Sequence, residues 1–273
     1  MAERNLLVRR GGIYTTREGM LLEIPPSGFD FRSISGHSGF NPDPFTDDEA
    51  TQRYPLGTKL TYGNRWFRYA LIGGASLSTG QVVGAKALIA GHSDEVWAGT
   101  AAAITATFTP SATAITANEY QDGYLNILSG TGKGYIYRIL NHPASDGSTI
   151  FTLNLIDPIV ITGASTPKGT LVQNAYGEII ATAVTTRIGQ PVGVAQGIVT
   201  NAQFGWVQTH GEASVLLIGT TVVGDDVIVP TGTTAASMGP RTTALDVGET
   251  VIGRVLEVST NNGDHLPVWL TIE

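Results

Sequence analysis

The stretch that decides the fold runs from Phe204 to Pro230 and reads FGWVQTHGEASVLLIGTTVVGDDVIVP. A second stretch of the same kind, VIGRVLEVSTNNGDHLPVWLTIE, covers Val251–Glu273. In both, short runs of Val, Ile, Leu and Trp are broken by Gly, by Gly-Asp-Asp or by Asn-Asn-Gly. This pattern predicts short antiparallel strands joined by tight turns. Such sequence fills most of the chain and reactive side chains are scarce, which indicates a protein built to present surfaces.

The composition favours β-structure over helix. Among 273 residues there are 34 glycines and 13 prolines, with only 14% charged residues, and this suits turns better than long helices. An apolar content of 42% argues against general disorder. The chain has no cysteine, which excludes disulfides, thiolate metal sites and a Cys nucleophile.

The charge is unevenly distributed along the chain. The net charge is −7, and residues 170–273 account for most of it, with three arginines against nine acidic residues (3 − 9 = −6). An acidic C-terminal half is repelled by phosphate backbones, so we expect no nucleic-acid partner. The first 32 residues carry five arginines among four acids, a mixture that favours a protein partner. No stretch reaches the roughly 18 uninterrupted apolar residues of a membrane span, and no apolar leader is visible, so we expect a soluble protein.

Three regions are predicted. Residues 1–57 contain Pro-Pro, Gly-Gly and a Gly/Ser cluster and read as an extended irregular arm, with one short helix beginning at Thr46 and stopped by Pro55. Residues 58–167 read as a first β-rich domain, and residues 168–273 as a C-terminal β-barrel or sandwich domain. The predicted fold class is therefore mainly β, with antiparallel barrel or sandwich blocks, an irregular N-terminal arm and little helix.

Individual strands can be placed within these regions. Residues 59–70 read as a hairpin that turns at Gly63-Asn64, with Trp66 and Arg68 on the face opposite Phe67. Residues 120–128 and 134–140 read as two strands around the turn Ser129–Lys133. Near the end of the chain, alternation predicts a strand with Val268, Leu270 and Ile272 on one side.

The motifs that could carry chemistry are weak. Gly130–Gly134 (GTGKG) resembles part of a phosphate-binding loop but lacks the early Gly, the Ser/Thr after Lys and a following helix, so a turn is favoured. His37 and His92 stand beside serines without a Gly-x-Ser-x-Gly turn. The five histidines lack metal-ligand spacing, and Asp225-Asp226 reads as a solvated turn rather than a calcium site. We predict no catalytic residue, no cofactor and no metal.

Two sets of phrases resemble a known family. Tyr54–Ala70 (YPLGTKLTYGNRWFRYA), followed by LSTGQVV at 77–83, is similar to sequences of tailed-bacteriophage virion proteins. The phrases IGQPVGV at 188–194, GWVQTHGEA at 205–213 and IGRVLE at 252–257 resemble β-rich phage head decoration (cement) proteins. Together they touch somewhat under half of the chain.

The resemblance implies a non-enzymatic structural protein. Members of that family bind the outer surface of an icosahedral capsid as trimers and stabilise the head by bridging adjacent subunits of the major capsid protein. The expected partners are thus the major capsid protein and two further copies of this chain. The expected location is the virion surface, after synthesis in the host cytoplasm. This chain is long for a minimal cement protein, so the first β-rich region could be an added lobe.

The arm supplies the predicted capsid or subunit contacts. Charged contacts are assigned to four arginines and apolar contacts to two aromatic residues: Arg4, Arg9, Arg10, Arg17, Tyr14 and Phe29.

Other classes remain open from sequence. A tail or fibre module that binds carbohydrate or a receptor would need an exposed ladder of Trp and Tyr. A glycosidase would need two carboxylates across one cleft, whereas the acids here stand in turn-like settings. A major capsid subunit is disfavoured because long helical sequence is missing.

Overall fold

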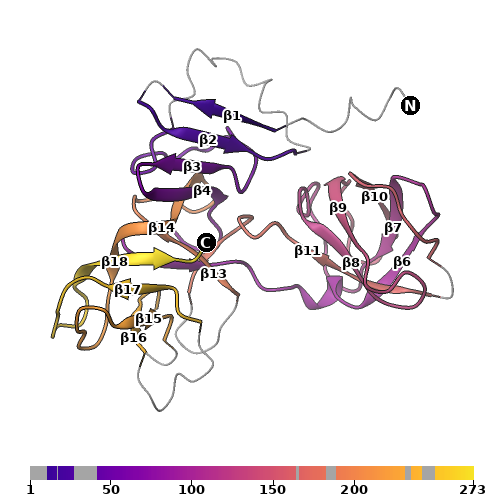
Figure 1. Ribbon diagram of the computed structural model, residues 1–273. Coiled ribbons are helices and arrows are strands. Elements are labelled where there is room, and N and C mark those ends of the chain that lie inside the picture. The colour runs from indigo at the N-terminus through magenta and orange to yellow at the C-terminus, as the bar shows by residue number, and fades with distance from the viewer. Residues whose placement is uncertain are drawn as a thin grey trace. The chain divides into compact units, whose positions relative to one another are not determined.

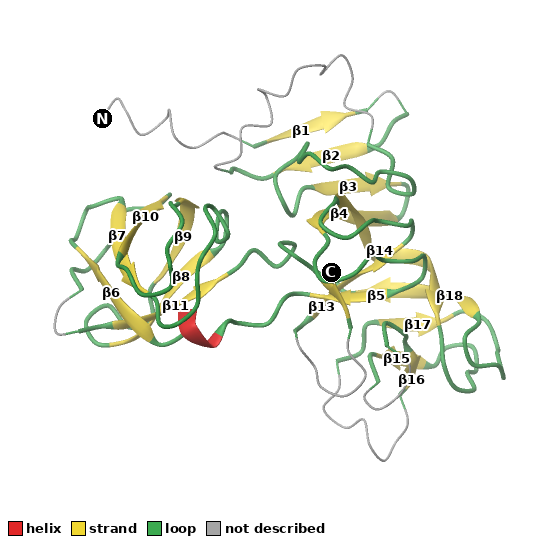
Figure 2. Cartoon of the chain, turned by 180° about the vertical axis from the view of Figure 1, so that it is seen from behind, coloured by secondary structure: helices red, strands yellow, loops and turns green. Residues whose placement is uncertain are grey.

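The computed structural model describes residues 11–16, 18–27, 42–163, 166–182, 189–230, 235–241 and 250–273. These residues form two compact units, each with antiparallel strands and its own core (Figure 1). The barrel unit comprises residues 87–174 with Gly11, Pro26 and Ser27. The sheet unit comprises the remaining described residues. The mainly-β fold class is therefore confirmed, and the helix found in the described part is a 3-10 turn at Ala90–His92 (Figure 2).

The sheet unit is built on one twelve-stranded sheet. The path through it runs β1-β2-β3-β4-β14-β18-β17-β15-β16, and β5, β12 and β13 pair beside it. The strands are β1 (Gly12–Thr15), β2 (Leu21–Ile24), β3 (Lys59–Tyr62), β4 (Arg65–Leu71), β5 (Val82–Gly84), β12 (Ile180–Ala181), β13 (Pro191–Ala195), β14 (Phe204–Leu216), β15 (Asp226–Ile228), β16 (Gly239–Pro240), β17 (Gly253–Val255) and β18 (His265–Thr271).

Strand β14 is the spine of this sheet. Its first half pairs with β4 and its second half with β18, so one 13-residue strand joins two layers of the core. One layer gathers Val207 and its neighbours with Ala70 and Val83, and the other gathers Val215 with Val268. Both halves of β14 therefore pair with a neighbouring strand and contribute side chains to the core.

A β-bulge interrupts β14 at its midpoint. Gln208 lies opposite Phe67 and His210 lies opposite Trp66, so Thr209 is the extra residue. The buried Gln208 amide donates to the carbonyls of His210 and Glu212 and holds the bulge. Gly211 follows at φ 83, and a Cβ there would lie 2.4 Å from the Asn64 carbonyl oxygen, so the position requires glycine.

The barrel unit closes six antiparallel strands in the order β10-β7-β6-β11-β8-β9. They are β6 (Glu95–Gly99), β7 (Thr105–Thr109), β8 (Tyr124–Ser129), β9 (Ile136–Asn141), β10 (Phe151–Leu155) and β11 (Lys168–Val172). Trp97 fills the interior with Phe108 and other buried side chains. Its ring lies against Gly163 and Gly169, where a Cβ would approach within 3.0 and 3.3 Å of it. Small residues around one large ring are how a narrow barrel reaches native packing density.

The barrel unit is an insertion into the sheet unit. It leaves after β5 and returns before β12, and these two strands pair with each other, with Gly84 opposite Ile180. Lys86 and Glu178, just beyond that pair, form an ion pair. The chain therefore enters and leaves the barrel through two neighbouring, hydrogen-bonded strands, which is the arrangement that tolerates an inserted domain.

Several local predictions are confirmed. The hairpin at Gly63-Asn64 forms between β3 and β4, and the strands around Ser129–Lys133 are β8 and β9. In β18, Val268 and Leu270 are buried while Trp269 is half-exposed.

The predicted domain boundaries do not coincide with the two units. The predicted first β-rich domain includes β3, β4 and β5, which belong to the sheet unit, and the closed barrel lies within residues 95–172. Residues 12–15 and 21–24, expected in an irregular arm, pair as β1 and β2.

The short helix predicted from Thr46 is wrong. Asp43 caps a single turn there by accepting from the Phe45 N–H, and the chain then extends. Glu49 exchanges both backbone hydrogen bonds with Phe204, at 3.0 and 2.8 Å. Pairing with β14 satisfies the backbone that a helix would have satisfied, so tertiary contact overrides the capping signal.

Candidate interaction surfaces

His92 is buried in the barrel unit and both of its ring nitrogens are bonded. Nε2 lies 3.0 Å from the Thr113 carbonyl and Nδ1 lies 2.5 Å from the Tyr120 hydroxyl. Because a carbonyl oxygen only accepts, Nε2 carries the proton and Nδ1 accepts from Tyr120. The neighbouring Ser93 hydroxyl lies against Thr170 instead, at 3.2 Å. The His-Ser segment therefore holds barrel loops together and forms no nucleophile–base pair.

His142 has a similar structural role in the barrel unit. Its Nε2 accepts from the Tyr120 N–H at 2.9 Å, so its Nδ1–H donates to the Pro143 carbonyl at 2.8 Å. Burial lowers the pKa of His142 below its usual 6.5, because the charged imidazolium would lose its hydration. A buried imidazole with both ring nitrogens hydrogen-bonded is a structural element.

The carboxylates of the Asp225-Asp226 turn are both bonded to nearby groups of the same unit. Asp225 accepts from the Val222 N–H at 2.8 Å, and Asp226 accepts from Arg254 at 3.0 Å. Within the described part of the chain, no cluster of three or more His, Asp or Glu side chains is placed to hold a metal ion. These two carboxylates therefore serve a turn and an ion pair.

A row of side chains crosses one face of the sheet unit, from β3 through β4 and β14 to β18. Trp66 stacks on His210 with ring centroids 4.3 Å apart, and Trp269 meets the same imidazole edge-on at 5.7 Å. The Lys59 ammonium lies 3.6 Å from the Trp66 ring centroid. The bulge at Thr209 places His210 opposite Trp66, which is how this stack becomes possible.

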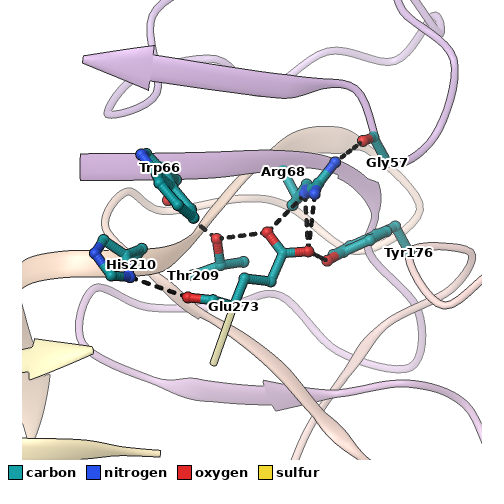
Figure 3. Close-up of polar contacts among 7 residues, drawn as sticks. All are labelled: Gly57, Trp66, Arg68, Tyr176, Thr209, His210 and Glu273. Atoms are coloured by element: carbon teal, nitrogen blue, oxygen red, sulfur yellow. Dashed lines mark hydrogen bonds and ion pairs between the residues drawn. The ribbon is translucent and has the colours of Figure 1, made fainter. Parts of the chain in front are cut away.

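Glu273 joins this row to a second set of polar groups (Figure 3). Its carboxylate accepts from Arg68 at 2.9 Å and from the Tyr176 hydroxyl at 3.1 Å, and it lies 3.2 Å from the Thr209 hydroxyl. Its backbone carbonyl accepts from His210 Nδ1 at 3.0 Å. Burial and the nearby carboxylate raise the pKa of Tyr176, so it stays a hydrogen-bond donor. The cluster ties the end of the chain to β4 and β14.

The row does not offer a platform for sugar rings. Stacking on a sugar requires a free aromatic face, and Trp66 has Lys59 on its ring and His210 stacked against it. Most of the other aromatic residues that could have formed a ladder are buried core residues: Phe67, Tyr69, Trp97, Tyr120, Tyr137 and Trp206. Most of the aromatic signal in the sequence thus belongs to the cores and to this one stack, and Tyr124 is an exposed exception on β8.

The sheet unit has an open edge at β1. In the described part of the chain β1 pairs with β2 alone. Thr16 donates to the Met20 carbonyl at 2.8 Å, so by antiparallel alternation the backbone groups of Ile13 and Thr15 face outward from the edge. Ile13 is 71% exposed. An unpaired edge with an exposed isoleucine is a template for pairing with another chain.

Of the predicted contact residues, Tyr14 lies on this edge strand. It is half-buried, and its ring lies against the backbone of Gly12. Beside the strand is a hollow of about 290 Å³ whose lining includes Ile13, Glu23 and Arg68. The other predicted contacts lie outside the described residues: Arg4, Arg9, Arg10, Arg17 and Phe29.

Two groups of exposed aliphatic side chains were missed by the sequence reasoning. One is the aliphatic patch of the sheet unit, formed by Val222, Val223, Leu256 and Val258. The other lies on the outside of the barrel and includes Leu128 and Ile136, on the paired strands β8 and β9. Consecutive Val222-Val223 before Gly-Asp-Asp was an available signal, because a turn leaves such residues outside the core.

No protein-family model, curated protein or solved structure matches this chain. No helix in the described part of the chain is long and apolar enough to cross a membrane.

Proposed function

We propose that this chain is a structural protein of a tailed-phage virion, which binds the outer surface of the icosahedral head as a homotrimer and stabilises it by bridging adjacent capsid subunits. The proposal starts from the phrases at residues 54–83, which resemble tailed-phage virion proteins, and from those at 188–257, which resemble head decoration proteins. The acidic balance of the chain suits a surface that faces away from packaged DNA.

The observation that carries the proposal is the open edge at β1. This strand follows directly on the arginine-bearing N-terminal residues, and its outward backbone groups and the exposed Ile13 are available for a strand of another protein. Strand addition supplies a row of main-chain hydrogen bonds and a side-chain contact, which suits a permanent structural contact.

The test is co-sedimentation of the purified chain with heads assembled without it, followed by thermal disruption of the heads. We expect bound chain to raise the temperature at which heads release DNA. Ile13→Pro removes an outward N–H without removing a β1–β2 hydrogen bond, and we expect it to weaken head binding at least tenfold. A proline at Ile136 would not be a fair control, because β9 is a strand of the closed barrel. The matched control is therefore a pair of alanine variants, Ile13→Ala at the sheet edge and Ile136→Ala on the barrel.

The outcomes are distinct. Absence of co-sedimentation for the parent chain would refute the function. Head binding that Ile13→Pro leaves unchanged would refute the edge as the contact. A solution mass other than three times 28.7 kDa, measured by light scattering both free and after release from heads, would refute the trimer.

A tail or fibre carbohydrate-binding module is the second candidate. It is weakened by the covered faces of Trp66 and by the burial of the other aromatic residues. Measurable affinity on a glycan array would restore it.

A further inference from the structure

The aliphatic patch lies where two loops of the sheet unit run antiparallel. Thr221 donates to the Ser259 carbonyl at 2.9 Å, and Gly224 donates to the Val255 carbonyl at 2.8 Å. The bridge between Thr221 and Ser259 brings the residue after Thr221 near the residue before Ser259, and these two, Val222 and Val258, are exposed, at 58% and 57%. Two adjoining loops therefore carry four exposed aliphatic side chains, and an apolar surface of this kind is typical of a contact with another protein.

The rim of the patch is acidic. Glu257 is exposed between Leu256 and Val258, and Asp225 closes the turn that carries Val222 and Val223. Asp264 lies beside the second loop, where it accepts from Ser259 at 3.1 Å. The nearby Arg254 is paired with Asp226. The patch therefore combines an apolar centre with an excess of negative charge.

A segment of the same chain has the complementary chemistry. Residues 4–10 read RNLLVRR, three consecutive aliphatic residues flanked by Arg4 on one side and by Arg9 and Arg10 on the other. We infer that this segment of one copy binds the aliphatic patch of a neighbouring copy. Leu6, Leu7 and Val8 cover the exposed valines, and the arginines meet the acidic rim.

The segment is too short to reach the patch of its own copy. Leu7 stands five residues before Gly12, where β1 begins, so it reaches about 17 Å from the start of β1. β17, which leads into the second loop of the patch, is six strand positions from β1, about 29 Å at the usual spacing. β1 and the group β15–β17 lie at opposite ends of the sheet unit in both views (Figures 1 and 2). The contact must therefore form between copies.

Such a contact is head-to-tail, because the segment and the patch are different surfaces. Repeated around a symmetry axis, it closes a ring of subunits. The inference deepens the proposed function, from which it takes the contact role of the N-terminal arginines, and it names their partner as a second copy of this chain.

Complementation between two variants tests the contact directly. The first variant, Leu7→Asp with Arg9→Glu, has a broken segment and an intact patch. The second, Val222→Asp with Val258→Asp, has a broken patch and an intact segment. Since all four positions are exposed or lie outside the described fold, we expect both variants to fold. By sedimentation velocity on the full chain we expect the parent to be oligomeric, each variant alone to be monomeric, and the equimolar mixture to form dimers only.

Controls separate this contact from a general loss of solubility. Ile136→Asp places the same charge on an exposed isoleucine of the barrel and is expected to leave the oligomer intact. Glu257→Arg is expected to weaken self-association at least tenfold, and Arg9→Glu in the same chain to restore part of it. The association is expected to weaken as salt rises, because the rim charges are solvent-exposed.

Three results would overturn the inference: a monomeric parent, an oligomer that survives either double variant, or two monomeric variants whose mixture stays monomeric. None of these uses capsids. Normal head binding by a parent that fails this test would leave the proposed function standing, whereas a ring that forms without head binding would refute the function and keep the contact.

Discussion

The two units use the same short antiparallel strands but treat their edges differently. The barrel unit closes on itself, so each of its six strands has two neighbours. The sheet unit stays open, and β1 and β16 stand at the two ends of its strand path. A closed barrel satisfies its own backbone, whereas an open sheet leaves donors and acceptors that a partner can use.

This difference assigns association to the sheet unit. Within the described residues, its β1 edge pairs on one side only and its aliphatic patch is exposed, and the two lie at opposite ends of one sheet. The barrel is stabilised from within by the buried Trp97 ring and by the hydrogen bonds of His92 and His142. It therefore resembles an inserted module that is stable by itself. Three predictions test how independent the two units are.

The largest expected effect is on the barrel core. Trp97→Ala removes a ring that is 1% exposed and is expected to lower the free energy of unfolding of the barrel unit by about 3–5 kcal/mol. The remaining tryptophans, Trp66, Trp206 and Trp269, all lie in the sheet unit. Their fluorescence in a denaturant titration should therefore keep the parent midpoint, while circular dichroism shows an earlier second transition.

The mirror experiment uses Trp206→Ala, because Trp206 is equally buried but belongs to the sheet unit. It should move only the sheet transition. A single transition that shifts in both variants would show that the units unfold together and would contradict their independence.

A smaller effect is expected at the cluster that ties the sheet unit together. Arg68→Gln removes the ion pair to Glu273, whose partners have side-chain exposures of 25% and 28%. We expect a loss of about 1 kcal/mol in the sheet unit, since both groups are partly solvated. Lys86→Gln, at the more exposed pair where the barrel is inserted, should cost less. Equal losses measured by urea titration would contradict the role given to Arg68.

The smallest effect is a difference in pH dependence. Because the pKa of His142 is lowered on folding, the unfolded barrel binds the proton more tightly. This contribution to barrel stability is complete above the unfolded pKa of about 6.5 and is lost as pH falls below it. Thermal unfolding between pH 7.5 and 5 should show the loss in the barrel transition, and His142→Gln should reduce it.

The sheet unit has a buried carboxyl group whose pKa is shifted in the opposite direction. Burial raises the pKa of Asp47, whose carboxylate accepts from the Trp206 indole, so its contribution is largest below pH 3.8 and declines as pH rises through the raised pKa. A sheet transition that weakened below pH 6.5 in parallel with the barrel and regardless of His142→Gln would contradict the assignment.

The sequence by itself determined the local elements. Period-2 alternation with Gly-rich or Asn-Gly-containing turns identified the β3–β4 hairpin, the β8–β9 pair and the buried side of β18, because register and turn chemistry are local properties. It failed at Thr46, where a valid capping pattern lost to backbone pairing between Glu49 and Phe204, residues far apart in the chain.

Only the tertiary structure decided which strands share a unit and which apolar side chains stay in water. Strands of the barrel and of the sheet have the same alternation, so nothing local marks β5 and β12 as the two ends of an insertion. Val222 and Val215 look alike in sequence, yet one is exposed and the other is core. The physical reason is that burial depends on what the rest of the chain brings against a residue, and pairing partners over 100 residues away, as between β4 and β14, set that environment.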